Sequence, residues 1–290
     1  MSELNVAPAH IPPLPDVVLE PIVRLALLED LGRGGDITSD AVLDPDAPMS
    51  ALVRSRQEGC SAGYDAARLA LRLIDPSASW ISLQPEGVSF RAGAGLVRLE
   101  GRASSLLACE RVALNFMGRL SGVASLTQAY VRAVDGYRAR IVCTRKTTPG
   151  HRALEKRAVR LGGGVNHRLG LDDAILIKDN HIAAAGGVRQ ALERARAHVG
   201  HLRAVEIEVD TLDQLEEVLA TPPDAVLLDN MSPETLERAV AMTAGRCKTE
   251  ASGGVTLDTV RRIAAAGVDF ISVGALTHSA PCLDLGLDID

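Results

Sequence analysis

The stretch AVEIEVDTLDQLEEVLATPPDAVLLDNMSPETLERAVAM, residues 204–242, decides the fold. It contains two short aliphatic runs, and each run ends in polar residues and is followed by a segment with helical period. Four further runs, ARIVCTRK, DAILIKDN, CKTEASGG and DFISVGA, show the same order, and the six recur at intervals of 20 to 35 residues. Repetition of strand, polar strand end and helix is typical of a parallel α/β barrel.

The number of runs predicts the shape of this barrel. About six strands fall short of the usual eight, so we expect an open, incomplete α/β barrel. The carboxyl ends of the strands in such a barrel meet at one rim, where its active sites lie. The residues expected at this rim are Lys146, Lys178, Glu208, Asp229, Ser252 and Gly274.

The first part of the chain predicts a smaller domain. Residues 16–31 are apolar with helical spacing; Pro21 is tolerable only in a first turn, and Gly32 is a natural stop. Short β-like runs between residues 51 and 100, ALVRSR, SWISLQ and GLVRLE, are separated by Gly, Pro and Ser. This pattern predicts a small α/β sandwich.

A helix is expected to link the two domains. Residues 105–134 have helical period, although Gly118 and Gly122 argue against one straight helix. The predicted organisation is a flexible N-terminus at 1–15, an α/β sandwich domain with the linker helix at 16–118, and a barrel domain at 119–290.

Composition excludes several function classes. Three Phe, three Tyr and one Trp leave few rings to stack on bases, and the chain carries −6, so no nucleic acid is expected as a partner. No apolar run approaches about 18 residues, so no membrane is expected either. Five scattered cysteines without a CxxC spacing indicate reduced thiols and a cytoplasmic protein.

Positive charge is concentrated between residues 138 and 178. This segment holds ten Lys and Arg against three acids, in a chain that is acidic overall. Within it, Thr144, Arg145 and Lys146 end a strand and precede TTP at residues 147–149, which resembles a helix start with hydroxyl caps. A solvated basic turn is the alternative. The concentration of charge favours an anion-binding site.

A glycine triplet at residues 162–164 precedes His167 and Arg168. Glycine permits positive φ and close approach of the backbone to a ligand, although a flexible connector would also explain the triplet. Arg168 offers a planar fork for two hydrogen bonds to a carboxylate or phosphate, and His167 is the second candidate for binding.

Lys178 closes the aliphatic run AILI. A lysine at a strand end faces an anion, forms a Schiff base, or pairs with the neighbouring Asp179. His181 is a candidate partner of the site. Four other histidines lie in segments that read as solvent-facing and receive no role: His10, His151, His198 and His201.

Single acids end the next two strands. Glu208 and Asp229 suit ribose hydroxyls or Mg²⁺, and acids that merely cap the core are the alternative. We expect Glu208 rather than Glu206 to point inward, a choice that one residue of register slip would reverse. The sequence gives no metal-ligand geometry. The loops after the last two strands are expected to bind phosphate through backbone N–H groups of Ser252, Gly253, Gly254, Gly274 and Ala275.

The order and spacing of these motifs resemble the decarboxylating quinolinate phosphoribosyltransferase family. The resemblance spans nearly the whole chain, through EDLGRGGDITSD, CERVALN, TRKTTPG, GGGVNHRLGL, ILIKDNH, EIEVD, LLDN, EASGG and VGALTHS. It implies a pentosyltransferase of de novo NAD synthesis, which converts quinolinate and phosphoribosyl pyrophosphate into nicotinate mononucleotide, pyrophosphate and CO₂. It also implies Mg²⁺ with the diphosphate and no organic cofactor.

The resemblance also implies roles for individual residues. Lys146, Lys178, Glu208 and Asp229 form the catalytic set, with the two acids at the ribose hydroxyls and Mg²⁺. The glycine loops take the 5-phosphate. The resemblance implies a homodimer, with higher assembly left open, in which Arg111 of CERVALN reaches into the partner's site. The residues expected to bind quinolinate and the pyrophosphate are Arg111, Thr144, Arg145, Lys146, His167, Arg168 and Lys178.

Departures from the family pattern are few. His151 stands where an aliphatic is usual, and CSAGYDAA is a polar version of a more apolar segment. A related family associated with molybdenum transport usually lacks the lysine of ILIKDNH, so Lys178 argues against it. Two alternatives stay open: a Schiff-base aldolase or decarboxylase that uses Lys178, and a non-catalytic sensor of phosphorylated sugars.

Overall fold

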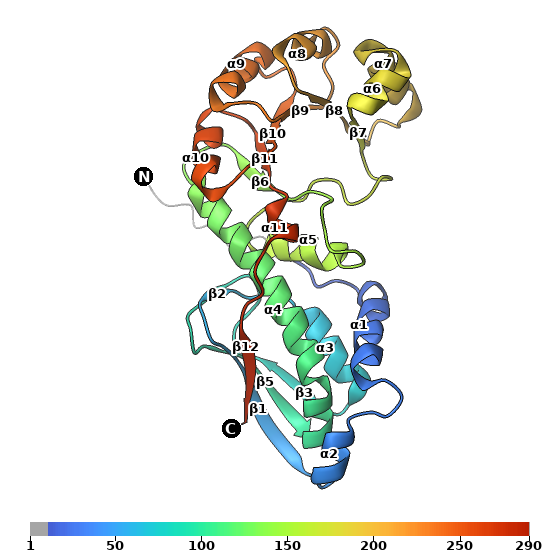
Figure 1. The fold of residues 1–290 in the computed structure, drawn as a ribbon, viewed down its shortest axis with the longest axis vertical. Coiled ribbons are helices and arrows are strands. Elements are labelled where there is room, and N and C mark those ends of the chain that lie inside the picture. Colours follow the sequence, from blue (N-terminus) through green and yellow to red (C-terminus); the bar gives the residue numbers. More distant parts are fainter. Residues whose placement is uncertain (1–10, 290) are drawn as a thin grey trace. The chain divides into compact units, whose positions relative to one another are not determined.

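The structure is a computed structural model, and it describes residues 11–289. Residues 1–10 of the predicted flexible N-terminus, His10 among them, lie outside the described residues. The chain forms two compact units (Figure 1). The first comprises the residues up to Ser125, Thr148–Gly163 and those from Ala280 onward, and the second comprises Leu126–Thr147 and Gly164–Ser279. Because the units interleave along the chain, the predicted single division at residue 118 stays a prediction.

The first unit is built on a four-stranded antiparallel sheet in the order β12-β1-β5-β3. Its strands are β1 (Pro48–Ser55), β3 (Ser79–Ser82), β5 (Gly95–Arg102) and β12 (Leu285–Ile289), and β2 (Gly59–Cys60) pairs with β4 (Ser89–Phe90) beside it. The runs ALVRSR, SWISLQ and GLVRLE therefore form strands as predicted. The C-terminal strand β12 was not predicted; it aligns Ala51 of β1 with Ile289.

Helices complete the first unit: α1 (Asp16–Leu31), α2 (Ile37–Val42), α3 (Tyr64–Ile74), the first part of α4 (Ala103–Ala133), and α5 (Arg152–Leu161). The core between sheet and helices is mainly aliphatic, with Val53, Leu96, Leu106 and Met117 at most 1% exposed. Aliphatic burial of this kind supplies most of the favourable free energy of folding.

Helix α1 has the predicted bounds, and the amide of Gly32 closes it by bonding to the carbonyl of Leu28 at 3.0 Å. The expectation that Pro21 lies in a first turn is wrong. Pro21 is the sixth residue of the helix, and its ring leaves the carbonyl of Val17 without the usual amide donor. Val17 is 78% exposed, so water can donate the hydrogen bond to that carbonyl instead.

Helix α4 is a single helix, although its glycines suggested an interruption. A Cβ at Gly118 would lie 2.7 Å from the carbonyl oxygen of Leu283, and one at Gly122 would lie 1.8 Å from that of Pro281. The two glycines therefore let the segment before β12 run directly against the helix.

The second unit contains a six-stranded parallel sheet in the order β6-β11-β10-β9-β8-β7. Its strands are β6 (Arg140–Val142), β7 (Ile175–Ile177), β8 (Val205–Val209), β9 (Ala225–Asp229), β10 (Lys248–Ser252) and β11 (Phe270–Ser272). All six predicted runs are strands. Within residues 11–289, β6 and β7 have no pairing with each other, so the barrel is open as expected.

Helices of the second unit follow the strands: α6 (Asp179–Ala185), α7 (Val188–His198), α8 (Leu212–Leu219), α9 (Pro233–Thr243), α10 (Leu257–Ala265) and α11 (Ala275–His278). Figure 1 shows α7, α8, α9 and α10 in succession along one face of the curved sheet. Buried aliphatic residues such as Val205, Ile207 and Val209 alternate along β8 with acidic residues. The alternation leaves the acids on the opposite, concave face.

None of the helices in the described part of the chain combines the length and the apolar character needed to cross a membrane. All five cysteines are free thiols, and four of them are buried.

Candidate active site

Parallel register places the acids of neighbouring strands on one face of the sheet. Glu208 on β8 is opposite Leu227 on β9, which is in turn opposite Glu250 on β10, so the three side chains share the concave face. Glu206 lies two residues before Glu208 and therefore points to the same face. The expectation that Glu208 faces inward while Glu206 does not is wrong, because residues two apart in a strand share a face.

Lys178 directly follows β7 and forms an ion pair with Glu208. Its expected alternative partner, Asp179, instead accepts a hydrogen bond from the amide of Asn180 at 2.7 Å. His181 accepts a hydrogen bond at Nδ1 from the amide of Lys178, at 3.0 Å, and so caps the start of α6. The Lys178 side chain remains 46% exposed, which leaves its ammonium group accessible to a ligand.

Asp229 ends β9 opposite Ser252 at the end of β10. One oxygen of Asp229 accepts a 2.6 Å hydrogen bond from the side-chain Nδ2 of Asn230. Glu208 and Asp229 thus stand near the ends of adjacent strands on one face, and carboxylate oxygens are the donors that Mg²⁺ prefers. The expected role of the two residues in holding a Mg²⁺ ion or ribose hydroxyls stays a prediction.

Two arginines of the second unit lack partners for buried nitrogen atoms. The Nε atoms of Arg145 and Arg168 are buried and make no hydrogen bond within the described chain. Burial, followed by the nearby charge of Arg145, lowers the pKa of Arg168. Two close guanidinium groups with unsatisfied buried donors are an arrangement that an anion would complete.

Backbone pairing brings these arginines together. Val165 forms a parallel bridge with Val142 at the edge of β6, and its amide donates to the carbonyl of Ile141 at 2.9 Å. The segment that carries His167 and Arg168 therefore runs beside the strand that leads into Arg145. The glycine triplet ends α5, since the amide of Gly162 bonds to Ala158, and so it makes a turn into this segment.

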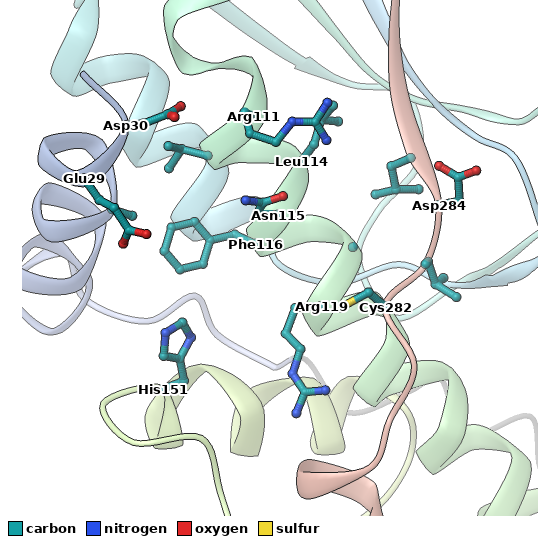
Figure 2. A pocket seen from close by; sticks show the side chains of 15 residues that line it. Glu29, Asp30, Arg111, Leu114, Asn115, Phe116, Arg119, His151, Cys282 and Asp284 are labelled. Atoms are coloured by element: carbon teal, nitrogen blue, oxygen red, sulfur yellow. The ribbon is translucent and has the colours of Figure 1, made fainter. Parts of the chain in front are cut away.

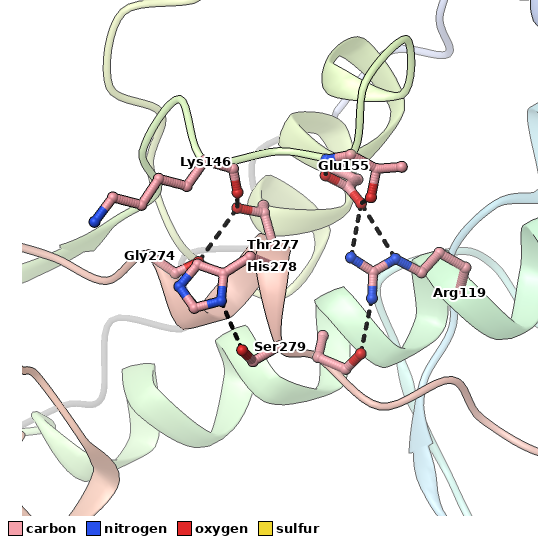
Figure 3. Close-up of polar contacts among 9 residues, drawn as sticks. Arg119, Lys146, Glu155, Gly274, Thr277, His278 and Ser279 are labelled. Carbon is pink, nitrogen blue, oxygen red and sulfur yellow. Dashed lines mark hydrogen bonds and ion pairs between the residues drawn. The ribbon is translucent and has the colours of Figure 1, made fainter.

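Lys146 is held through its backbone. Its amide donates to the Thr144 hydroxyl at 3.0 Å, and its carbonyl accepts a 2.8 Å hydrogen bond from the hydroxyl of Thr277 (Figure 3). A Cβ on Gly274 would lie 3.3 Å from the Lys146 Cδ, so the start of α11 is close to this side chain. The exposed ammonium of Lys146 is left free to approach a ligand.

The predicted helix start at residues 147–149 is wrong. Helix α5 begins at Arg152 without a side-chain cap, and the hydroxyl of Thr148 instead donates to Glu155 at 2.8 Å. Helix α10 begins at Leu257, after the loop that follows β10. In the preceding loop, Gly253 has φ +92°, and a Cβ there would lie 2.1 Å from the Asn230 Oδ1, so only glycine fits.

A buried cluster of His167, Glu206 and Glu250 was missed from the sequence. The His167 Nε2 lies 2.9 Å from Glu206 Oε2 and 3.8 Å from Glu250 Oε1. The alternation in EIEVD could have indicated that Glu206 faces inward, because side chains two residues apart in a strand share a face and Glu208 was expected there. Nothing in the sequence indicated that a loop histidine would reach both β8 and β10.

Arg111 lies in the first unit, whereas Arg145 and Arg168 lie in the second. Its side chain is 63% exposed, and its guanidinium lies 4.0 Å from the carboxylate of Glu110. It lines a cavity of about 450 Å³ together with Glu29, Asp30 and Arg119 (Figure 2). His151 also lines this cavity and stacks on Phe116 with ring centroids 5.9 Å apart, so its solvent-facing reading is wrong. Burial lowers the pKa of His151.

Comparison with known proteins matches almost the whole chain to one family. The N-terminal domain of quinolinate phosphoribosyl transferase matches residues 36–121, and its C-terminal domain matches residues 123–288. A probable nicotinate-nucleotide pyrophosphorylase (carboxylating) of Bacillus subtilis is 41% identical over 271 residues, which are 93% of each protein. The corresponding enzyme of Mycobacterium leprae is 44% identical over 272 residues, 92% of this chain and 95% of that protein.

A solved structure has the same fold. The nicotinate-nucleotide pyrophosphorylase of Francisella tularensis superimposes with a TM-score of 0.92 at 38% identity, over 97% of this chain and 99% of that chain. It follows from this similarity, together with the rim of basic and acidic residues on an open six-stranded barrel, that the chain belongs to the quinolinate phosphoribosyltransferase family.

Proposed function

We propose that this protein is a decarboxylating quinolinate phosphoribosyltransferase, which forms nicotinate mononucleotide, pyrophosphate and CO₂ from quinolinate and phosphoribosyl pyrophosphate. The observation that carries the proposal is the pair of buried, unsatisfied Nε atoms on Arg145 and Arg168. A planar dicarboxylate offers acceptors in the geometry that guanidinium groups bind best. Lys146 and Lys178 add exposed ammonium groups to the same rim.

The residues present suit a transfer without a general base. The pyridine nitrogen of quinolinate carries a free lone pair, so attack on ribose C1 needs alignment and stabilisation of the departing pyrophosphate. Lys146 and Lys178 are the cations for that charge. As the bond to pyrophosphate breaks, positive charge develops on the ribose, and Glu208 and Asp229 stabilise it while they hold the hydroxyls. Mg²⁺ held by the same two acids would screen the diphosphate.

Decarboxylation follows from the charge of the product. The pyridinium formed by the transfer is an electron sink, so the adjacent carboxylate leaves as CO₂ and a proton must be added at that carbon. Lys146, His167 and water are the candidate donors of this proton. Both ring nitrogens of His167 are engaged, with Glu206 and with the amide of Arg168, which favours Lys146 or water.

A complete site requires a second copy of the chain in this proposal. Arg111 is exposed and would be donated to the partner's site in a homodimer, where it would add a third guanidinium for quinolinate. The glycine loops at residues 252–254 and 274–275 would take the 5-phosphate through backbone N–H groups. The five free thiols fit a cytoplasmic enzyme.

A Schiff-base reaction at Lys178 is the second candidate function, and one observation weighs against it. The nitrogen of Lys178 forms an ion pair with Glu208, so it would have to leave this partner before it could attack a carbonyl. Borohydride treatment in the presence of a carbonyl substrate would leave Lys178 unmodified if the transferase proposal is right.

The deciding experiment is a turnover assay. Purified protein with quinolinate, phosphoribosyl pyrophosphate and Mg²⁺ is expected to release pyrophosphate and CO₂ in equal amounts, and nicotinate is expected to replace quinolinate poorly. Absence of both products, with the protein folded and the phosphosugar bound, would instead support a non-catalytic sensor.

A further inference from the structure

The environment of His167 determines which of its nitrogens carries the proton. The amide of Arg168 donates to His167 Nδ1 at 2.8 Å, so this nitrogen is an acceptor and carries no hydrogen. The other nitrogen, Nε2, lies 2.9 Å from a carboxylate oxygen of Glu206 and must therefore be the donor. The ring is thus held as the neutral Nε2–H tautomer, since an imidazolium would place two N–H donors against each other at Nδ1.

The two carboxyl groups near the ring are not equivalent. Glu206 is within hydrogen-bond distance of Nε2, whereas the nearest oxygen of Glu250 is 3.8 Å away and makes no hydrogen bond within the described chain. Burial, with the negative charge of Glu206, raises the pKa of Glu250. The distances therefore make Glu206, and not Glu250, the acceptor of the His167 Nε2–H group.

The cluster connects the sheet to the residue expected to bind substrate. His167 and Arg168 lie in a segment without helix or strand, and β8 supplies Glu206. Through the His167 ring, Glu206 fixes the Arg168 amide, while the guanidinium is held on its other side by a 3.0 Å hydrogen bond from Nη1 to the carbonyl of Ala174. These two anchors leave the buried Nε of Arg168 as the donor for a ligand.

We propose that Glu206 is a positioning residue for substrate binding: it locks the His167 ring so that Nδ1 holds the Arg168 amide and thereby aims the guanidinium at a substrate carboxylate. This inference rests on the proposed function for the identity of the substrate, but not for the arrangement of the three side chains. It assigns a role to Glu206 and makes His167 the link between Glu206 and Arg168.

The first test reads the tautomer directly in the unmodified protein. Nitrogen-15 NMR of histidine-labelled protein is expected to show a protonated Nε2 and an unprotonated Nδ1 on His167. The variant His167→Asn assigns these signals among those of the seven histidines. A protonated Nδ1, or an imidazolium near neutral pH, would overturn the proposal. This reading does not depend on catalysis, so it stands even if the protein fails to turn over quinolinate.

The second test compares matched variants in the turnover assay. Glu206→Leu is expected to raise the KM for quinolinate about tenfold through loss of a charged hydrogen bond, with the KM for phosphoribosyl pyrophosphate within about twofold. Glu250→Leu removes a neighbouring carboxyl group of similar burial that makes no hydrogen bond to His167, and it should change the quinolinate KM by less than about threefold. Glu206→Gln keeps an acceptor oxygen and should restore most of the affinity for quinolinate. It serves as the test variant if Glu206→Leu does not fold.

A double-mutant cycle separates positioning from general support. If Glu206 acts through His167, then Glu206→Leu should add little to the quinolinate KM of His167→Leu. Additive effects, or equal effects of Glu206→Leu and Glu250→Leu, would contradict the proposal.

The three donor atoms also lie within 4.8 Å of one another, as ligands of a metal ion would. Metal analysis of the purified protein after dialysis should find less than stoichiometric metal, and one tightly bound ion per chain that is lost in Glu206→Leu would overturn the assignment. If no variant and no unmodified protein turns over quinolinate while the tautomer is as expected, the proposed function fails and the His167 arrangement stands.

Discussion

The guanidinium of Arg119 donates two hydrogen bonds to one carboxylate oxygen of the buried Glu155, from Nη2 at 2.8 Å and from Nε at 3.2 Å (Figure 3). Its Nη1 donates a third hydrogen bond, to the carbonyl of Ala280 at 2.7 Å. The Glu155 side chain is fully buried, and it also accepts hydrogen bonds from the amide and hydroxyl of Thr148. Three segments of the first unit, on α4, on α5 and before β12, thus converge on one charge pair.

Removal of one partner of this pair is expected to be costly. Arg119→Ala leaves the Glu155 carboxylate buried without its counter-charge, so the free energy of unfolding should fall by about 3–5 kcal/mol. Urea denaturation measures the loss. The control is Arg262→Ala, which breaks an ion pair with Glu234 whose side chains are 69% and 71% exposed, and it should cost less than about 1 kcal/mol. Similar losses in both variants would contradict the importance given to burial.

Gly122→Ala is expected to destabilise the protein, although alanine is the better helix former. Propensity alone would favour alanine by about 1 kcal/mol, but the new Cβ would lie 1.8 Å from the carbonyl oxygen of Pro281. We expect a net loss of about 2–4 kcal/mol in thermal or urea unfolding. Gly200→Ala, where no atom lies within 4 Å of the new Cβ, should change stability by less than about 0.5 kcal/mol. A stabilised Gly122→Ala would show that the chain before β12 can move away from α4.

Asp75 gives the first unit a pH-dependent contribution to stability. Its carboxylate accepts hydrogen bonds from the Ser77 amide and hydroxyl, from Arg102 and from Ser105. The Ser77 hydroxyl, with the other donors, holds the pKa of Asp75 below its ordinary value of 3.8. A lowered pKa means that the stabilisation is present above the unfolded-state value and disappears as the pH falls through the folded-state value.

Asp75→Asn should therefore reduce the free energy of unfolding by about 2 kcal/mol at neutral pH, and the difference from the unmodified protein should shrink below about pH 4. Urea denaturation at a series of pH values measures both effects, with the exposed Asp46→Asn as the control. A difference that stays constant down to pH 2 would argue against the charged hydrogen bonds as its origin.

Arg168→Ala should weaken quinolinate binding more than phosphoribosyl pyrophosphate binding, because the side chain is expected to face the dicarboxylate. Loss of a charged bidentate contact corresponds to an increase in the quinolinate KM of about 30-fold or more. Arg189→Ala, an exposed arginine on α7, should leave both KM values unchanged. Equal losses for the two substrates would refute the division of roles between them.

Most of the barrel was predictable because its strands are short aliphatic runs with polar ends, and local pattern decides such elements. β12 was not, since LGLDI becomes a strand only through pairing with β1, more than 200 residues earlier. The place of Lys178, Glu208 and Asp229 at strand ends followed from pattern alone. The contact of His167 with Glu206 did not, because it depends on how far the sheet curves, which no local pattern records.

The pairing of β12 with β1 has a consequence for synthesis of the chain. The first strand of the antiparallel sheet leaves the ribosome early, but one of its edges stays unpaired until Leu285–Ile289 have emerged. An unpaired strand edge is prone to association with other chains, so a nascent chain, or one cut before β12, should depend on chaperones for as long as β12 is missing.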